Sequence, residues 1–145
     1  MPHPTRQILH FVDGKVRDGG SGKYGDVFDP ATGEVQARVA LATVADVDGA
    51  VSAAQAAFPA WAATTPLNRA RILFKFKELL EAHADEIAAC ITSEHGKVLA
   101  DARGELTRGL EVVEFACGAP HLLKGEHSMN VGRDVDSYTE YAPLG

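Results

Sequence analysis

Apolar residues between positions 43 and 124 recur every three or four residues, a spacing that places them on one face of an α-helix. The first helix is expected to begin after Thr43, whose hydroxyl suits an N-cap, with Asp46 near the positive end of the helix dipole. Its apolar stripe comprises Val44, Val47, Val51, Ala54, Phe58 and Trp61. Pro59 is expected to end or kink this helix, because proline lacks the N–H that a helix interior uses.

The same periodicity predicts two more long helices. Thr65-Pro66 is typical of an N-cap followed by a first-turn proline, and Gly96 is expected to stop the second helix. The stripe of the second helix comprises Ile72, Leu73, Phe76, Leu79, Leu80, His83 and Ile87. The stripe of the third helix comprises Leu99, Ala102, Leu106, Leu110, Val113 and Cys117. The chain is therefore expected to contain three long amphipathic helices.

The segment before the helices consists of short apolar runs separated by turn residues, a pattern typical of short strands. Residues 8–12 form an apolar run, Asp13-Gly14 is the pair typical of a type I′ hairpin turn, and residues 15–17 return along the run. Residues 26–28 and 34–39 flank a second turn that contains proline and glycine. We therefore predict a small β layer ahead of the helices.

Composition and charge narrow the class of protein. With 145 residues, of which 46% are hydrophobic and 23% charged, the chain is typical of a soluble globular domain. Its net charge of -6 argues against nucleic-acid binding, and no apolar run is long enough to cross a membrane. The first residues lack the apolar centre of a signal peptide. We therefore expect a cytoplasmic protein with no nucleic-acid or membrane partner.

Residues 20–25 satisfy the G-x-G-x-x-G fingerprint of dinucleotide sites. That fingerprint binds a pyrophosphate only where it follows a strand and opens a helix, because free N–H groups of the first helical turn meet the phosphates. Here residues 26–30 follow, and a segment that ends in Asp29-Pro30 cannot begin that helix. We interpret residues 20–25 as a flexible loop between strands, with no cofactor-binding role.

The histidines and cysteines offer no reactive or metal-binding cluster in the sequence. The six histidines are scattered, without a spacing that would make ligands converge on a metal, so no metal site is expected. Cys90 and Cys117 both fall in apolar helical stripes, and Cys90 has only alanine and isoleucine beside it. A nucleophilic cysteine needs a partly exposed, electropositive setting. Core packing is therefore the favoured interpretation of both cysteines.

Arg108 interrupts an otherwise apolar helical face that it shares with Val112, Phe115 and Ala119. One interpretation is a surface arginine paired with Glu105 and Glu111, each about one turn away. The other is a guanidinium that waits in an apolar groove for a carboxylate, which it would hold through two parallel hydrogen bonds. Spacing alone favours the surface ion pair.

Five segments resemble the opening of the aldehyde dehydrogenase superfamily: residues 28–35, 53–61, 69–76, 94–97 and 108–116. The third and fifth are similar to its methylmalonate-semialdehyde branch. Enzymes of that branch oxidise malonate or methylmalonate semialdehyde by cysteine attack and hydride transfer to NAD. The carboxylate leaves as carbon dioxide, and CoA takes the remaining acyl group as acetyl-CoA or propionyl-CoA. The segments with the catalytic cysteine, general-base glutamate, cofactor lysine and oxyanion asparagine would follow Gly145. The resemblance therefore implies an N-terminal fragment with no catalytic or cofactor-binding residue, inactive alone.

The resemblance also implies a place for each part of the chain. It implies an α+β fragment of a larger α/β fold, with residues 1–125 in the cofactor-binding domain and the catalytic domain absent. Residues 126–145 look extended and match the start of the arm through which family members assemble as homo-oligomers. Arg108 falls at a position that lines the substrate tunnel, which favours its role as a carboxylate clamp. The alternatives are another branch of the family, which would release a free acid, and a non-catalytic helical interaction module.

Overall fold

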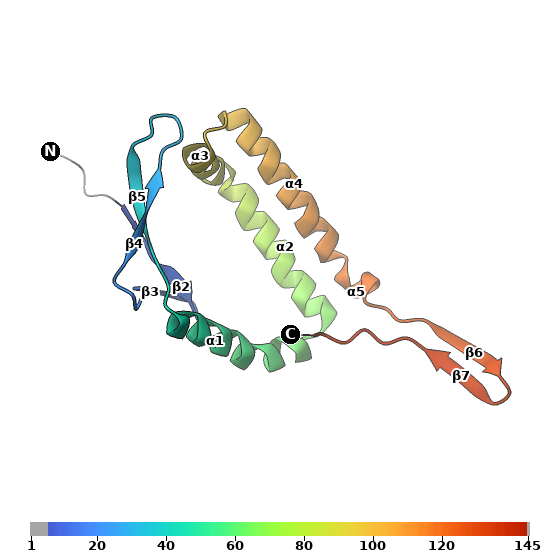
Figure 1. Ribbon diagram of the computed structural model, residues 1–145. Helices are drawn as coiled ribbons and strands as arrows, with labels where there is room; N and C mark the ends of the chain where they lie inside the picture. Colours follow the sequence, from blue (N-terminus) through green and yellow to red (C-terminus); the bar gives the residue numbers. More distant parts are fainter. Residues whose placement is uncertain (1–5, 145) are drawn as a thin grey trace.

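The computed structural model describes residues 6–144 and has an α+β architecture (Figure 1). A three-stranded sheet has the order β1-β5-β4, with β1 at Arg6–Ile8, β4 at Tyr24–Phe28 and β5 at Val35–Ala40. Strand β5 pairs in parallel with β1 and antiparallel with β4. A separate hairpin joins β2 at His10–Val12 to β3 at Lys15–Arg17. The predicted small β layer is therefore confirmed.

The two predicted turns arise from local turn chemistry. Asp13 and Gly14 have φ values of 55° and 68°, the left-handed conformation that a type I′ turn needs at both central positions. In the turn between β4 and β5, Gly33 has a φ of 74°, and its N–H donates to the carbonyl oxygen of Asp29 at 2.8 Å. The Asp29 carboxylate accepts a second hydrogen bond, from the N–H of Ala31 at 2.8 Å. Both turns are confirmed where the sequence placed them.

Helix α1 covers Val44–Ala63 and begins with the predicted cap. The Thr43 hydroxyl accepts from the Asp46 N–H at 3.2 Å, and Asp46 Oδ2 accepts from the Thr43 N–H at 2.7 Å, which completes a capping box. Pro59 lies inside the helix, so the expectation that the helix ends there is wrong. Proline removes one N–H donor, and the helix continues by one further turn to a C-cap at Thr64.

The second predicted helix is two helices, because the chain leaves helical geometry at His83. Helix α2 covers Pro66–Ala82 with its N-cap at Thr65, and α3 covers Ala84–His95. His83 has φ −107° and ψ 18°. Asp85 and Glu86 follow in the first turn of α3, where acidic side chains favour a new helix N-terminus. Gly96 ends α3 in the left-handed conformation with φ 82°, as predicted.

Helix α4 covers Leu99–Cys117 and is followed by a short helix α5 at Ala119–Leu122. In Figure 1, α2 and α4 run side by side, and α3 joins them at one end. The buried residues of these three helices are all small: Ala70, Ala88, Ala102 and Cys117. Within residues 6–144, the other buried residues are Ala37 and Ala40 in β5. Alanines at helix contacts let the backbones approach closely, so the core is thin. Larger apolar side chains remain at least partly accessible.

The end of the chain forms a two-stranded hairpin of β6 at His127–Gly132 and β7 at Val135–Tyr138. Figure 1 shows this hairpin extending away from the helices. Every residue of the two strands is exposed, and these include Met129 at 70% and Tyr138 at 75%. Within residues 6–144, no helix combines the length and the apolar character that crossing a bilayer requires.

Candidate functional site

Arg108 lies on the outer face of α4, opposite the face that packs against α2 and α3. Ala102 and Cys117 mark the inner face, because both are buried, whereas Arg108 is exposed. An open hollow surrounds the arginine, lined by Ala100, Asp101, Gly104, Glu105, Thr107, Arg108 and Glu111. We define these residues as the Arg108 hollow. All of these residues lie on the single helix α4, so the hollow is open to solvent on its other side.

The acidic residues near Arg108 do not neutralise it. Glu105 pairs with Lys97, and this charged hydrogen bond holds the pKa of the Glu105 carboxyl below its ordinary value. Within residues 6–144, Arg108 forms no hydrogen bond or ion pair, so the surface pairing with Glu105 and Glu111 is not present. Asp101 and Glu111 still line the hollow and reduce its attraction for an anion. The guanidinium keeps all its donors available.

An apolar wall continues from Arg108 along the same face of α4. Val112 and Phe115 follow at positions one and two turns further on and are 68% and 70% exposed. A guanidinium beside apolar side chains suits an organic carboxylate, because the charged end meets two parallel donors and the carbon chain meets apolar surface. The predicted face is therefore present for Arg108, Val112 and Phe115, and its chemistry fits a small carboxylate. Ala119 was expected on the same face but belongs to α5, because α4 ends at Cys117.

The glycine-rich segment 20–25 has a structural task. Residues 20–23 lie in the loop that connects β3 to β4, as expected, whereas Tyr24 and Gly25 already belong to strand β4. The Gly20 N–H donates to Asp46 Oδ2 at 3.0 Å, and the Ser21 hydroxyl donates to the carbonyl oxygen of Leu41. These bonds attach the loop to the start of α1. Because no helix N-terminus follows it, the segment does not fit a dinucleotide pyrophosphate.

The two cysteines differ in exposure. Cys117 is buried against α2, as predicted, but Cys90 is exposed, so the core interpretation of Cys90 is wrong. The buried residue of α3 is Ala88, and Cys90 lies about 200° around the helix from it. Alanine neighbours in sequence therefore gave no information about its surroundings in space. The described residues 6–144 contain no group of three or more potential metal ligands.

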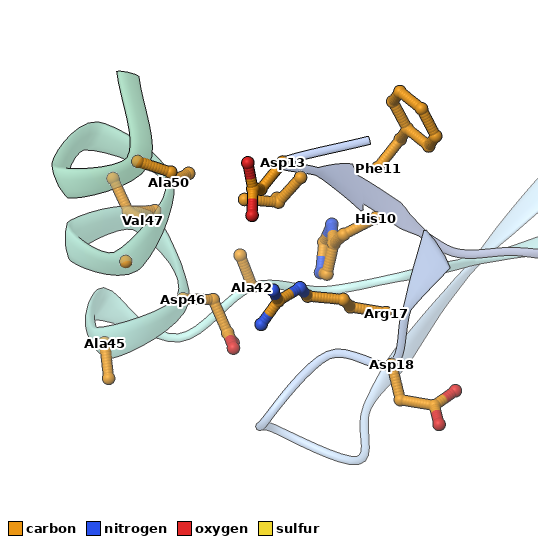
Figure 2. Close-up of a pocket in the computed structure, with 13 residues that line it drawn as sticks. His10, Phe11, Asp13, Arg17, Asp18, Ala42, Ala45, Asp46, Val47 and Ala50 are labelled. Carbon is orange, nitrogen blue, oxygen red and sulfur yellow. The ribbon is translucent and has the colours of Figure 1, made fainter. Parts of the chain in front are cut away.

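A pocket that the sequence did not predict lies between the β2–β3 hairpin and the start of α1 (Figure 2). His10 and Arg17 point from the hairpin toward α1, and Asp46 faces them from the helix. The Nε2 atom of His10 is buried without a hydrogen-bond partner in the described structure. Nothing in the sequence could reveal this pocket, because it forms only when the hairpin packs on the helix. Phe11 points away from it and is 73% exposed.

A sequence profile of the aldehyde dehydrogenase family matches residues 16–145, and the chain belongs to that family. It is 48% identical over 139 residues to a malonate-semialdehyde dehydrogenase of Pseudomonas aeruginosa. It is 44% identical over 142 residues to the mitochondrial, acylating methylmalonate-semialdehyde/malonate-semialdehyde dehydrogenase of Rattus norvegicus. These alignments cover 95% and 98% of this chain but only 28% and 26% of the two relatives.

Solved structures agree with the sequence relatives. A Sinorhizobium meliloti protein assigned as a methylmalonate-semialdehyde dehydrogenase, solved in complex with NAD, superimposes with a TM-score of 0.94 at 46% identity. The match covers 99% of this chain and 29% of that structure. The fold of this chain is therefore that of a part of an aldehyde dehydrogenase, and the expected resemblance is confirmed.

Proposed function

We propose that this chain is the N-terminal portion of an NAD-dependent, CoA-acylating oxidoreductase. The enzyme converts malonate or methylmalonate semialdehyde to acetyl-CoA or propionyl-CoA, and the substrate carboxylate leaves as carbon dioxide. The names of the relatives support the substrates and the acylating reaction, and the complex with NAD supports the cofactor. NAD and CoA would both be bound by the longer protein, since residues 20–25 do not fit a dinucleotide. The composition is that of a protein of the cytoplasm, where we place the enzyme.

In this proposal, Arg108 holds the carboxylate of the semialdehyde. The observation that carries it is a guanidinium without a partner in residues 6–144, on an exposed face that continues into Val112 and Phe115. Both proposed substrates carry a carboxylate next to a short carbon chain, which matches the charged and apolar parts of this face. The rest of the longer protein would close the site over the Arg108 hollow and supply the reacting groups.

We also propose that residues 1–125 belong to the cofactor-binding domain and that residues 126–145 begin an arm used in homo-oligomer assembly. The exposed β6–β7 hairpin supports the arm, because a two-stranded hairpin alone is only marginally stable in water. Pairing of its free edge with another strand would satisfy the unpaired backbone groups.

The test uses a full-length fusion, in which this chain replaces the matching segment of the Pseudomonas aeruginosa relative. The fusion should form NADH from malonate semialdehyde only with CoA present, and mass spectrometry should identify a CoA thioester. Turnover of uncharged aldehydes without turnover of either semialdehyde would instead assign the chain to another branch of the family. No turnover with any aldehyde, from a fusion that is folded and binds NAD, would favour the non-catalytic interaction module.

Arg108→Leu in the same fusion tests the clamp. Removing one charged hydrogen-bonding partner costs about 1.5–3 kcal/mol, which lowers kcat/KM roughly ten- to hundredfold. The loss should be confined to malonate and methylmalonate semialdehyde, and propanal should be oxidised as before. Arg108→Lys should restore activity only in part, because an ammonium cannot form the two-pronged contact. Equal losses for charged and uncharged aldehydes would contradict the clamp.

A further inference from the structure

Two glycines, Gly104 and Gly109, lie in the middle of α4, where glycine is less favourable than alanine because its backbone loses more freedom on folding. A Cβ atom built at either position would meet nothing within 4 Å. Both glycines also have ordinary helical backbones, without a positive φ. Packing and backbone conformation within the described chain therefore explain neither glycine.

The two glycines point in different directions. Gly104 lines the Arg108 hollow and lies one turn before Arg108 on the outer face, whereas Gly109 is absent from that lining. Five residues at the helical period correspond to about 140° of rotation between Gly104 and Gly109. Only Gly104 therefore borders the space in which a ligand of Arg108 would lie, and Gly109 provides a matched position on the same helix.

Side chains on an α-helix lean toward its N-terminus, so a residue covers the turn before its own Cα. An arginine at position 108 consequently extends over the turn that contains Gly104. A carboxylate held by that guanidinium would lie above Gly104, and the next carbon of the substrate would lie close to the helix backbone. In methylmalonate semialdehyde, this next carbon carries the methyl branch. In malonate semialdehyde, it carries only hydrogen.

We propose that Gly104 is a specificity-determining position that leaves room for the methyl branch of a semialdehyde held by Arg108. The inference rests on the proposed function, because it takes the Arg108 clamp as given. A side chain at position 104 would fill the space beside the carboxylate and exclude the branched substrate more than the unbranched one. Glycine thus keeps both substrates acceptable, at the expense of helix stability.

The test compares Gly104→Leu with Gly109→Leu in the full-length fusion, since leucine favours helix at both sites. Gly104→Leu should lower the ratio of kcat/KM for methylmalonate over malonate semialdehyde by about 10–200-fold, the range for one carbon in a closed pocket. Gly109→Leu should leave that ratio unchanged. The melting temperature of both variants should equal or exceed that of the parent fusion.

An unchanged ratio in Gly104→Leu, or the same change in Gly109→Leu, would overturn the role of Gly104. Gly104→Ala adds a single carbon and should shift the ratio in the same direction by a smaller factor, which keeps the test decisive if leucine prevents folding. Thermal shifts provide a readout without turnover: Gly104→Leu should lose stabilisation by methylmalonate and keep that by malonate. Failure of the clamp itself is separate, because Arg108→Leu would then affect charged and uncharged aldehydes equally.

Discussion

The two faces of α4 differ in how completely their side chains are satisfied within this chain. On the inner face, Ala102 is fully buried and Cys117 is 8% exposed, both in contact regions with α2 and α3. On the outer face, Arg108 has no partner within residues 6–144, and Phe115 is 70% exposed. The inner face of α4 is thus used for packing within this chain, whereas the outer face has side chains that the chain itself leaves unpaired. Substitutions on the two faces should therefore separate stability from activity.

The start of α1 shows a similar contrast between paired and exposed side chains. Asp46 Oδ2 accepts hydrogen bonds from the N–H groups of Thr43 and Gly20, so the Asp46 carboxylate at this junction is paired. In the first two turns of the same helix, Val47 and Val51 are each 53% exposed. The apolar stripe that periodicity predicts on α1 is therefore largely exposed in this chain.

The largest expected effect is self-association of the isolated chain through the exposed apolar faces of its helices. The isolated 145-residue chain should self-associate and unfold without a sharp transition, because helices are stabilised mainly by packing and exposed apolar patches promote association. It should also form no NADH from semialdehyde and CoA. Size-exclusion chromatography with light scattering and circular dichroism would measure this. Replacing Val112 and Phe115 with lysine should shift the chain toward monomer, whereas a sharp melt from an unmodified monomer would contradict the expectation.

The next effect concerns the inner face of α4. Ala102→Leu inserts three carbons where the side chain has no accessible surface, and such overpacking costs about 1–3 kcal/mol of unfolding free energy. Thermal unfolding of the full-length fusion should show the loss. Ala100→Leu is the matched control, since Ala100 is exposed on the same helix, and its melting temperature should stay close to that of the parent. Equal destabilisation by both would show that the two faces are equally packed.

A smaller effect is expected at the helix cap. Thr43→Ala removes the hydroxyl that accepts from the Asp46 N–H, and loss of an N-cap typically costs about 1 kcal/mol. Thr43→Ser keeps the acceptor and should restore most of the stability. Chemical denaturation of the fusion would measure both variants, and kcat/KM should be unaffected. A serine variant as unstable as alanine would show that the methyl group matters more than the cap.

The Asp46 carboxyl should make this junction sensitive to acid. Hydrogen bonds, first from the Thr43 N–H, then from its hydroxyl and from the Gly20 N–H, hold the pKa of Asp46 below its ordinary value of 3.8. A lowered pKa in the folded state gives a stabilisation that is complete above the ordinary pKa and is lost as pH falls through the folded pKa. Stability measured against pH in acid should fall less steeply for Asp46→Asn than for the parent. Identical slopes would remove Asp46 from the acid response.

The smallest effect on stability is expected at Arg108. Because Arg108 has no partner within residues 6–144, Arg108→Leu should change the unfolding free energy of the fusion by no more than about 0.5 kcal/mol. Differential scanning calorimetry without substrate would detect a larger change. A clear destabilisation would show that the arginine contributes to the fold, and the contrast between the two faces of α4 would disappear.

Features that depend on a few neighbouring residues could be predicted from the sequence. The Asp13-Gly14 turn and the Thr43 cap follow from local φ preferences and local hydrogen bonds, and both are present. The break at His83 could not be predicted in the same way, since the apolar stripe continues across it. There, α2 and α3 both contact α4, and periodicity along one segment does not encode such a tertiary contact.

The candidate site shows the same division. Periodicity placed Arg108, Val112 and Phe115 on one face, but only the fold shows that this face is the outer one. The exposure of Cys90 and the pocket at His10 also depend on which elements meet in space, and residue spacing within one helix carries no such information. The role of the face came from the family resemblance rather than from spacing, which favoured an ion pair.

The core of small residues has a consequence for how this chain tolerates mutation. Cores built from leucine or phenylalanine are usually damaged by truncation, which leaves a cavity. Here the buried side chains in residues 6–144 are alanines and one cysteine, so almost nothing remains to be removed. Most substitutions at these positions enlarge the side chain, since only glycine is smaller than alanine, and an enlargement at a helix contact pushes two backbones apart. Substitution in this part of the fold is therefore limited mainly by an upper bound on the volume of the buried side chains.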